Sequence, residues 1–160
     1  MLPEKYKEYK LIIYGEGNSR EKLEELIREL GIEKRVILPG IIENVKEKIY
    51  KATMFVLSSR YEGMPNALME AMALGLPVIS TDCPCGGPRY LIKNEQNGIL
   101  VENDNIEELK NAMETILENK EFASKIGKNA NKIADTLNPY KVNKLWEKYI
   151  EKVYSKKSQK

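Results

Sequence analysis

Short apolar segments alternate with amphipathic segments along most of the chain. Runs rich in Ile, Val and Leu predict strands, which fall at residues 10–14, 35–38, 53–57, 77–80 and 98–101. Apolar residues at helical spacing predict helices, which fall at residues 18–30, 44–51, 65–74, 89–93, 106–117, 121–137 and 140–154. Strands that alternate with helices are joined by βαβ crossovers, so these segments predict a parallel sheet with helices on both faces.

The predicted fold class is therefore α/β, a doubly wound parallel sheet with further helices appended at its C-terminal end. The first strand, residues 10–14, is apolar enough to be buried and stops at a tight turn that begins with Gly15. Asn18, with Glu21 three residues later, resembles a capping box at the start of the first helix. In such a sheet a ligand lies at the carboxyl ends of the strands, so we expect functional residues in the loops that follow them.

The composition is typical of one compact domain. The chain has 160 residues, of which 42% are hydrophobic and 31% are charged. Lys and Arg number 26 against 24 Asp and Glu, and a net charge of +2 gives no field that would indicate nucleic acid as a partner. No apolar run approaches the roughly 20 residues that span a bilayer, and the first residues lack the apolar core of a signal peptide. We therefore expect a cytoplasmic location.

The chain contains no His, which excludes Ser-His-Asp and Cys-His catalysis within it. With no His to help them, Cys83 and Cys85 cannot supply a standard four-ligand zinc site. A redox or metal pair is one interpretation of Cys83 and Cys85, but free thiols packed in a turn of small residues are the commoner arrangement. The sequence predicts no metal and no cofactor, and leaves carboxylates, cations, hydroxyls and backbone dipoles for chemistry.

The densest chemical signal is the segment 58–77, which places two carboxylates around a loop-to-helix junction. Glu62 lies in the predicted loop, and Glu70 lies about one turn into the predicted helix. Between them, the free N–H groups and the positive dipole end of the helix start suit a diphosphate. A carboxylate accepts two hydroxyl groups at once, so one glutamate suits a ribose and the other a hexose. Two glutamates at this spacing also occur by chance on solvated helices, but residues 63–66 between them favour a binding site.

This segment resembles the motif of a known family, the retaining glycosyltransferases of family 4, also called group 1, with the two-domain GT-B architecture. The hallmark of that family is two glutamates separated by seven residues, here Glu62-Gly-Met-Pro-Asn-Ala-Leu-Met-Glu70. Further similarities are Tyr14-Gly-Glu-Gly after the first strand, Leu38-Pro-Gly after the second, the turn at residues 83–89, and Asn97-Gly before the fifth strand. The resemblance spans nearly the whole chain and implies the Rossmann-like half of a GT-B fold.

The resemblance also implies a role for each matching residue. Glu70 would bind the ribose hydroxyls, and Glu62, the implied catalytic residue, would contact the donor sugar. The other residues implied to bind the donor are Gly63, Met64, Pro65 and Asn66 at the sugar and diphosphate, Gly40, Ile41 and Ile42 at the nucleobase, and Gly15 and Gly17 in the same crevice. By themselves Gly15 and Gly17 also fit a simple strand-to-helix turn, since Arg20 stands where a dinucleotide fingerprint needs a third glycine.

By the same resemblance, the protein is expected to transfer a hexose from a nucleoside diphosphate sugar to an acceptor glycan or lipid-linked glycan, with retention, in polysaccharide biosynthesis. The family's amino-terminal acceptor domain has no counterpart in this sequence. A first strand-helix unit with a Gly-Arg…Lys-Gly pattern is also missing. We therefore expect residues 1–160 to form a single partial domain that binds the donor without turning it over alone. Its expected partners are the nucleotide sugar, the missing domain and the acceptor.

Two other functions remain open at this point. A nucleotide-sugar epimerase of the same architecture would need His and further carboxylates near the sugar. A flavodoxin-like or receiver-like module, which is not an enzyme, would need an acidic cluster or a phosphate loop rich in Ser and Thr. Arg60 and Arg89 lie in or near loops from which they could reach a phosphate, although a surface ion pair is the commoner role of such residues.

The last predicted helix, residues 140–154, has an apolar stripe on one side, and seven Lys lie between Lys141 and Lys160. A basic amphipathic helix can lie on an anionic membrane, so peripheral contact at the cytoplasmic membrane face is one interpretation. Alternatively the stripe packs on the protein itself, or it reaches the amino-terminal domain, as the final helix does in GT-B relatives.

Overall fold

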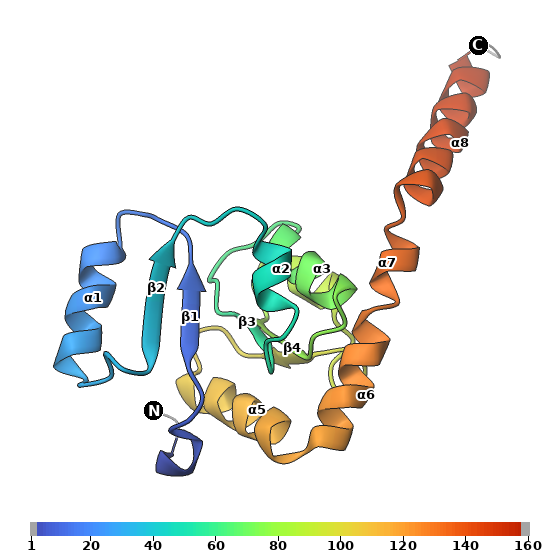
Figure 1. The fold of residues 1–160 in the computed structure, drawn as a ribbon. Coiled ribbons are helices and arrows are strands. Elements are labelled where there is room, and N and C mark those ends of the chain that lie inside the picture. The colour runs from blue at the N-terminus through green and yellow to red at the C-terminus, as the bar shows by residue number, and fades with distance from the viewer. Residues whose placement is uncertain (1–2, 158–160) are drawn as a thin grey trace. The chain divides into compact units, whose positions relative to one another are not determined.

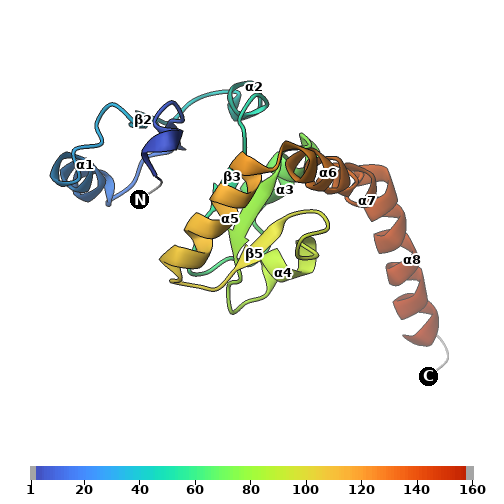
Figure 2. The same cartoon turned by 90° about the horizontal axis from the view of Figure 1, so that it is seen from below.

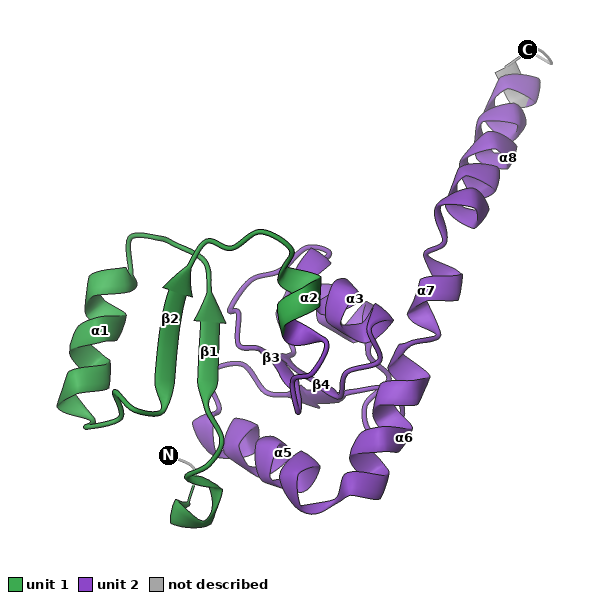
Figure 3. Cartoon of the chain, in the orientation of Figure 1, with its two compact units in different colours: residues 1–48 green, residues 49–160 purple. Residues whose placement is uncertain are grey.

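The computed structural model describes residues 3–157 of the chain, with side chains described through residue 155. By their internal contacts the residues form two compact units, Met1–Lys48 and Ile49–Lys160, called unit 1 and unit 2 (Figure 3). Each unit is described by itself. The single partial domain over residues 1–160 stays a prediction.

Unit 1 is built on a parallel pair of strands connected through a helix. Its elements are a 3-10 helix η1 (Glu4–Tyr6), β1 (Leu11–Tyr14), α1 (Arg20–Glu29) and β2 (Val36–Gly40) (Figure 1). Leu11 pairs with Val36 and Tyr14 with Gly40, in parallel register. The strands and the helix agree with the predicted segments to within about two residues, whereas the apolar pattern does not predict η1.

The structure corrects two expectations in unit 1. β1 is not buried, since Leu11, Ile12 and Ile13 are 50%, 44% and 37% exposed. A two-stranded sheet has too few neighbours to cover its strands, and no residue of α1 is buried. The capping box at Asn18 is also wrong, because the chain still turns there and the N-cap of α1 is Ser19, without a side-chain cap hydrogen bond.

Unit 2 contains a parallel sheet with helices on both faces. Its first elements are β3 (Phe55–Leu57), α3 (Asn66–Ala73), β4 (Val78–Thr81), α4 (Gly87–Leu91) and β5 (Ile99–Val101), while α2 (Val45–Ile49) crosses the boundary between the units. The strand order is β3-β4-β5, and both pairings are parallel. α3 and α5 (Ile106–Glu118) lie on opposite faces of this sheet (Figures 1 and 2). The predicted α/β class with parallel strands flanked by helices is confirmed.

The remaining helices follow α5 toward the C-terminal end. They are α6 (Lys120–Ala130), α7 (Ile133–Thr136) and α8 (Pro139–Lys157). The single helix predicted at residues 121–137 is therefore wrong, because it is divided between α6 and α7. At the division the side-chain amide of Asn131 donates a hydrogen bond to the Ala73 carbonyl at the end of α3. A tertiary contact of this kind cannot be seen in local periodicity.

The core of unit 2 lies between the sheet and the helices that cover it. On one face the buried cluster consists of Ile79, Ile99, Val101, Ala112, Ile116 and Ile126. On the other face Leu68 and Met72 of α3 are fully buried, as helical spacing of its apolar residues requires. All four residues of the central strand β4 are buried as well. The loops at the carboxyl end of this sheet therefore begin at strands that are packed into the core.

Candidate functional site

The two predicted glutamates lie at the junction between β3 and α3. Glu62 is in the loop of residues 58–65, which joins Leu57 at the end of β3 to Asn66 at the start of α3. Glu62 is half-buried, and its Oε1 accepts a hydrogen bond from the Ser59 hydroxyl at 2.7 Å. The orientation of the Glu62 carboxylate therefore depends on the position of Ser59.

Glu70 is the fifth residue of α3 and is also half-buried. The helix begins after Pro65, whose φ of −74° and ψ of 106° are extended. Proline has no polar side-chain atom with which to cap the helix, so the N–H groups of the first turn are left to water or to a ligand. The dipole at a helix start favours an anion there. The β3–α3 junction thus combines an anion-binding helix start with carboxylates in the loop before it and one turn after it.

The residues between the two glutamates present mainly backbone to solvent. Gly63, Met64 and Asn66 are exposed, whereas Pro65 is buried. A Cβ added to Gly63 would meet no heavy atom within 4 Å, so the protein leaves open space in front of this residue. Their role in binding a donor stays a prediction.

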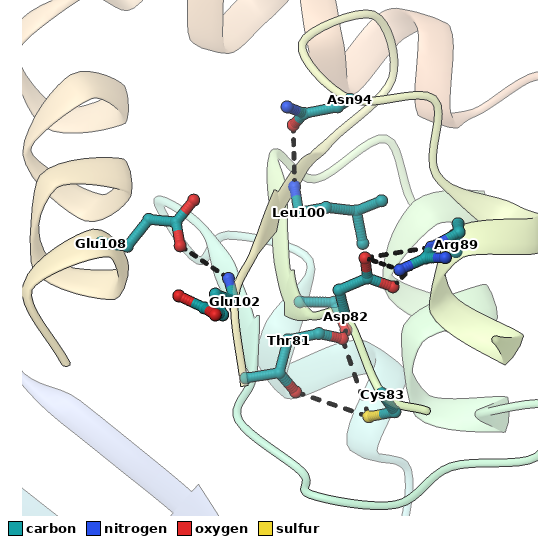
Figure 4. Close-up of polar contacts among 9 residues, drawn as sticks. Thr81, Asp82, Cys83, Arg89, Asn94, Leu100, Glu102 and Glu108 are labelled. Carbon is teal, nitrogen blue, oxygen red and sulfur yellow. Dashed lines mark hydrogen bonds and ion pairs between the residues drawn. The ribbon is translucent and has the colours of Figure 1, made fainter. Parts of the chain in front are cut away.

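The end of β4 contacts the loop that carries Glu62. Figure 4 shows Thr81, Asp82 and Cys83 at this strand end. The Thr81 hydroxyl and the Cys83 thiol both donate hydrogen bonds to the Ser59 carbonyl, the latter at 3.0 Å. Cys83 is buried, whereas Cys85 is exposed, and both are free thiols. This arrangement fits the expectation that Cys83 packs in a turn of small residues.

The two arginines considered as phosphate ligands, Arg60 in the loop after β3 and Arg89 in α4, form surface ion pairs. Arg89 Nη2 lies 2.5 Å from Asp82 Oδ2 (Figure 4), and Arg60 Nε lies 2.8 Å from Asp104 Oδ1. The hydrogen bonds that Arg89 donates to the Asp82 carboxylate, and the negative charge of that carboxylate, raise the pKa of the Arg89 guanidinium above its usual value. The commoner interpretation of both residues therefore holds, and neither needs a phosphate as its partner.

The predicted binding residues of unit 1 gather at the ends of β1 and β2. The Gly15 N–H donates to the Gly40 carbonyl at 2.9 Å. Gly40 has a φ of +81°, and a Cβ there would stand 2.7 Å from Glu16 Oε1. Arg20 pairs with Glu16 and also donates to the Leu38 carbonyl at 3.0 Å. Arg20 therefore links the loop after β1 to β2. The sequence showed only that Arg20 is not the third glycine of a dinucleotide fingerprint, and did not predict this contact.

The other predicted residues of unit 1 are accessible. Gly17 is exposed, Ile41 is 79% exposed, and Ile42 is half-buried. An isoleucine as exposed as Ile41 is available for an apolar contact with a ligand such as a nucleobase. That contact stays a prediction.

Two hollows of unit 2 lie away from the β3–α3 junction, one along α8 and one between the end of α3 and α6. Among residues 3–157, no helix is both long and apolar enough to cross a membrane. No group of three acidic or Cys side chains within the described range could hold a metal ion, and a function without a metal stays a prediction.

The parallel α/β fold, with its candidate binding groups at the carboxyl ends of the strands, places the chain in the class of Rossmann-like domains. The sequence model of one family, the glycosyl transferases group 1, matches residues 1–133. The chain therefore belongs to the group 1 glycosyl transferases, and the resemblance noted in the sequence is confirmed. This membership favours glycosyl transfer over the epimerase and over the flavodoxin-like or receiver-like module.

Individual relatives agree with this assignment. An uncharacterised glycosyltransferase of Methanocaldococcus jannaschii is 46% identical over 96 residues, which are 60% of this chain and 23% of the relative. An N-acetylgalactosamine-N,N'-diacetylbacillosaminyl-diphospho-undecaprenol 4-alpha-N-acetylgalactosaminyltransferase of Campylobacter jejuni is 32% identical over 141 residues, 88% of this chain and 38% of the relative. The crystal structure of S. aureus TarM in complex with fondaparinux, alpha-GlcNAc-glycerol and UDP has a TM-score of 0.80 at 28% identity, covering 89% of this chain and 28% of that one. The chain spans less than half the length of each.

Sequence reasoning did not find the residues that hold Glu62 in place. Ser59 and Thr81 are common polar residues, and nothing in their spacing marks them. The signal that was available is their position, since each follows or ends a predicted strand at the carboxyl edge of the sheet.

Proposed function

We propose that this chain supplies the donor-binding part of a glycosyltransferase that moves a hexose from a nucleoside diphosphate sugar to an acceptor, with retention at the anomeric carbon. The observation that carries the proposal is the β3–α3 junction, where Glu62 and Glu70 flank a helix start that no side chain of its N-cap closes. Family membership supports glycosyl transfer as the reaction. The UDP in the TarM complex supports a nucleoside diphosphate as part of the donor.

Each group at the junction suits one part of such a donor. The N–H groups of the first turn of α3 would donate to the diphosphate. Glu70, one turn further along, would accept hydrogen bonds from both ribose hydroxyls. Glu62 would face the sugar, for which the open space in front of Gly63 leaves room. The order of these groups along the chain then follows the order of sugar, diphosphate and ribose in the ligand.

The residues of unit 1 would bind the nucleobase. In this proposal Gly15, Gly17 and Gly40 present backbone, and Ile41 and Ile42 present apolar surface. Backbone groups discriminate poorly between bases, so the base is not assigned from these residues.

Retention follows if acceptor attack and donor departure occur on the same face of the sugar. The bond from the anomeric carbon to the phosphate oxygen breaks, and the bond from that carbon to the acceptor oxygen forms. The acceptor hydroxyl proton passes to the departing phosphate oxygen, so no protein base is needed in a chain without His. The protein's contribution is to position the donor and to stabilise the charge that develops on the diphosphate. No metal or cofactor takes part in this proposal.

The acceptor is proposed to be a glycan or a lipid-linked glycan. The name of the Campylobacter jejuni relative describes a sugar carried on diphospho-undecaprenol, which supports a lipid-linked acceptor of that kind. The acceptor would be held by a separate amino-terminal domain, as the resemblance to GT-B enzymes implies.

α8 offers a surface for one of these partners. Its stripe does not pack on the described part of the protein, since Leu145, Trp146, Tyr149 and Ile150 are 60–65% exposed. The expectation that the stripe packs on the chain itself is therefore wrong, because α8 extends beyond the core of unit 2. The amino-terminal domain and an anionic membrane remain as candidate partners for the apolar stripe of α8. Co-sedimentation with phosphatidylglycerol vesicles, but not with phosphatidylcholine vesicles, would assign α8 to the membrane, whereas no binding to either would exclude an anionic membrane as its partner.

A thermal-shift panel tests the proposed ligand class. UDP, GDP and ADP at 5–10 mM are compared with inorganic phosphate and flavin mononucleotide, since contacts that face water should give a dissociation constant on the order of 0.1–1 mM. At least one nucleoside diphosphate should raise the melting temperature, whereas phosphate and flavin mononucleotide should not. A rise with flavin mononucleotide alone would refute the proposal.

A further inference from the structure

We infer that the turn after β4, residues 81–87, positions the loop that carries Glu62, and that Thr81, Cys83 and Gly87 are positioning residues for the donor sugar. The functional half of this inference rests on the proposed role of Glu62. None of the three residues belongs to the predicted binding set. We call residues 81–87 the support turn.

The first contact between the support turn and the loop is a pair of partly buried hydrogen bonds. The Ser59 carbonyl accepts one from the Thr81 hydroxyl and one from the Cys83 thiol. Thr81 is 6% exposed and Cys83 is 1% exposed, so water does not compete effectively for these donors. The hydroxyl of the same Ser59 donates to Glu62. A displacement of the Ser59 backbone would therefore displace the Glu62 carboxylate.

The second contact is a close approach of two backbones at Gly87. A Cβ at this position would stand 2.7 Å from the carbonyl carbon of Gly63, nearer still to its oxygen, and 3.3 Å from the carbonyl oxygen of Glu62. These are backbone atoms, which cannot rotate away as the end of a flexible side chain can. A side chain at position 87 would therefore push residues 62 and 63 away from the support turn.

The support turn is anchored to the sheet on its other side. Thr81 is the last residue of β4, the central and fully buried strand. The Asp82 N–H donates to the Val101 carbonyl of β5 at 2.8 Å, and the Gly86 N–H closes the turn on the Cys83 carbonyl at 2.8 Å.

The loop of residues 58–65 has a further anchor at Arg60, whose carbonyl accepts a hydrogen bond from the Asn103 side chain at 3.1 Å and whose Nε lies 2.8 Å from Asp104 Oδ1. These two contacts are exposed to solvent and do not involve Ser59, Glu62 or Gly63. The conformation of residues 59–63 therefore depends on the support turn, which contacts them directly.

Loosening the support turn should affect binding of the donor sugar rather than binding of the nucleotide. Ser59, Glu62 and Gly63 lie before the helix start, whereas the proposed ribose and diphosphate groups lie on α3. Because α3 is held by its own buried face, loosening the support turn should spare nucleotide binding. It should reduce the preference for a nucleotide sugar over the bare nucleotide.

The test compares variants that remove each contact with variants that keep it. Thr81→Val removes the hydroxyl at nearly constant volume, and Thr81→Ser keeps it. Cys83→Ala and Cys83→Ser form a second pair. Gly87→Ala introduces the steric clash. The control is Gly127→Ala, where a Cβ would meet the backbone of Gly75 and stand 3.3 Å from the Pro77 nitrogen, on the α6 side of the unit.

Two measurements are made on the 160-residue chain. The first is amide hydrogen exchange at residues 59–63 without ligand, and the second is the ratio of the UDP and UDP-glucose dissociation constants. Thr81→Val and Gly87→Ala should accelerate exchange at residues 59–63 by about tenfold or more. They should lower the preference for UDP-glucose about threefold to tenfold and leave UDP affinity unchanged. The two serine variants should behave like the wild type, and Gly127→Ala should lower the melting temperature without either effect.

The outcomes separate this inference from the proposed function. Unchanged exchange at residues 59–63 in folded Thr81→Val would overturn the inference, and this isosteric variant carries the test if Gly87→Ala does not fold. Faster exchange with an unchanged UDP-glucose preference would show that Glu62 does not face the sugar, which overturns the functional half. Absence of UDP binding by the wild type would instead refute the proposed function. The hydrogen-exchange result would then still test whether the support turn positions residues 59–63.

Discussion

Replacing Glu70 with Ala should weaken nucleoside diphosphate binding without unfolding the domain. Hydrogen bonds to a charged group contribute about 1.5–3 kcal/mol. Glu70 is half-buried rather than buried, so water screens part of this energy and the expected loss is about 1.5–2 kcal/mol. At 1.4 kcal/mol for each factor of ten, the dissociation constant should rise about 10- to 30-fold. Ala is the best helix former, so α3 itself should not suffer from the change.

The assay is a titration of UDP followed by ligand-detected NMR, with circular dichroism melting to check the fold. The matched control is Glu114→Ala, which removes an equally half-buried glutamate from α5 on the other face of the sheet. Only the Glu70 variant should lose affinity. Equal affinity in wild type and Glu70→Ala, with both folded, would mean that Glu70 does not bind the ribose. An equal loss in the Glu114 control would mean that the effect is not local to the site.

Three further predictions concern the site and its scaffold. Glu62→Gln should leave UDP affinity nearly unchanged while lowering the advantage of the correct nucleotide sugar over UDP, and an equal loss for both ligands in calorimetry would place Glu62 away from the sugar. Ser59→Ala should reduce the same advantage by about 1 kcal/mol, the usual net value of a hydrogen bond, and combining it with Glu62→Gln should add little because the two residues act together. Ile126→Ala should lower the free energy of unfolding in urea by about 2–5 kcal/mol, since this side chain is fully buried; a loss below about 1 kcal/mol would contradict the core assignment.

Much of unit 2 could be predicted because its periodic segments pack against one core. α3 shows the spacing of a helix with one buried face, and β4 is a short run of apolar and small residues buried on both sides. The division between α6 and α7 could not be predicted, because it coincides with a hydrogen bond from Asn131 to a carbonyl 58 positions earlier. The exposure of β1 could not be predicted either, because the sequence of an apolar strand does not show how many neighbouring elements cover it.

The candidate site was predictable in part for a similar reason. Glu62 and Glu70 belong to one continuous motif, so their spacing and neighbours could be recognised along the chain. The contacts that hold Glu62 come from residues about twenty positions later in the sequence, at the end of another strand. Gly87 stood out only as one of two adjacent glycines. Its importance depends on the Gly63 backbone lying against it, which only the folded structure reveals.

The central claim is that the β3–α3 junction binds the diphosphate and ribose of a sugar nucleotide, and chemical-shift mapping tests it most directly. The ¹⁵N-labelled chain is titrated with UDP to 10 mM, because a site whose contacts face water should bind with a dissociation constant on the order of 0.1–1 mM. The account predicts saturable shifts at the amides of Asn66, Ala67 and Leu68, and their loss in Glu70→Ala. Saturable shifts confined to other parts of the chain, or no shifts at 10 mM, would contradict it.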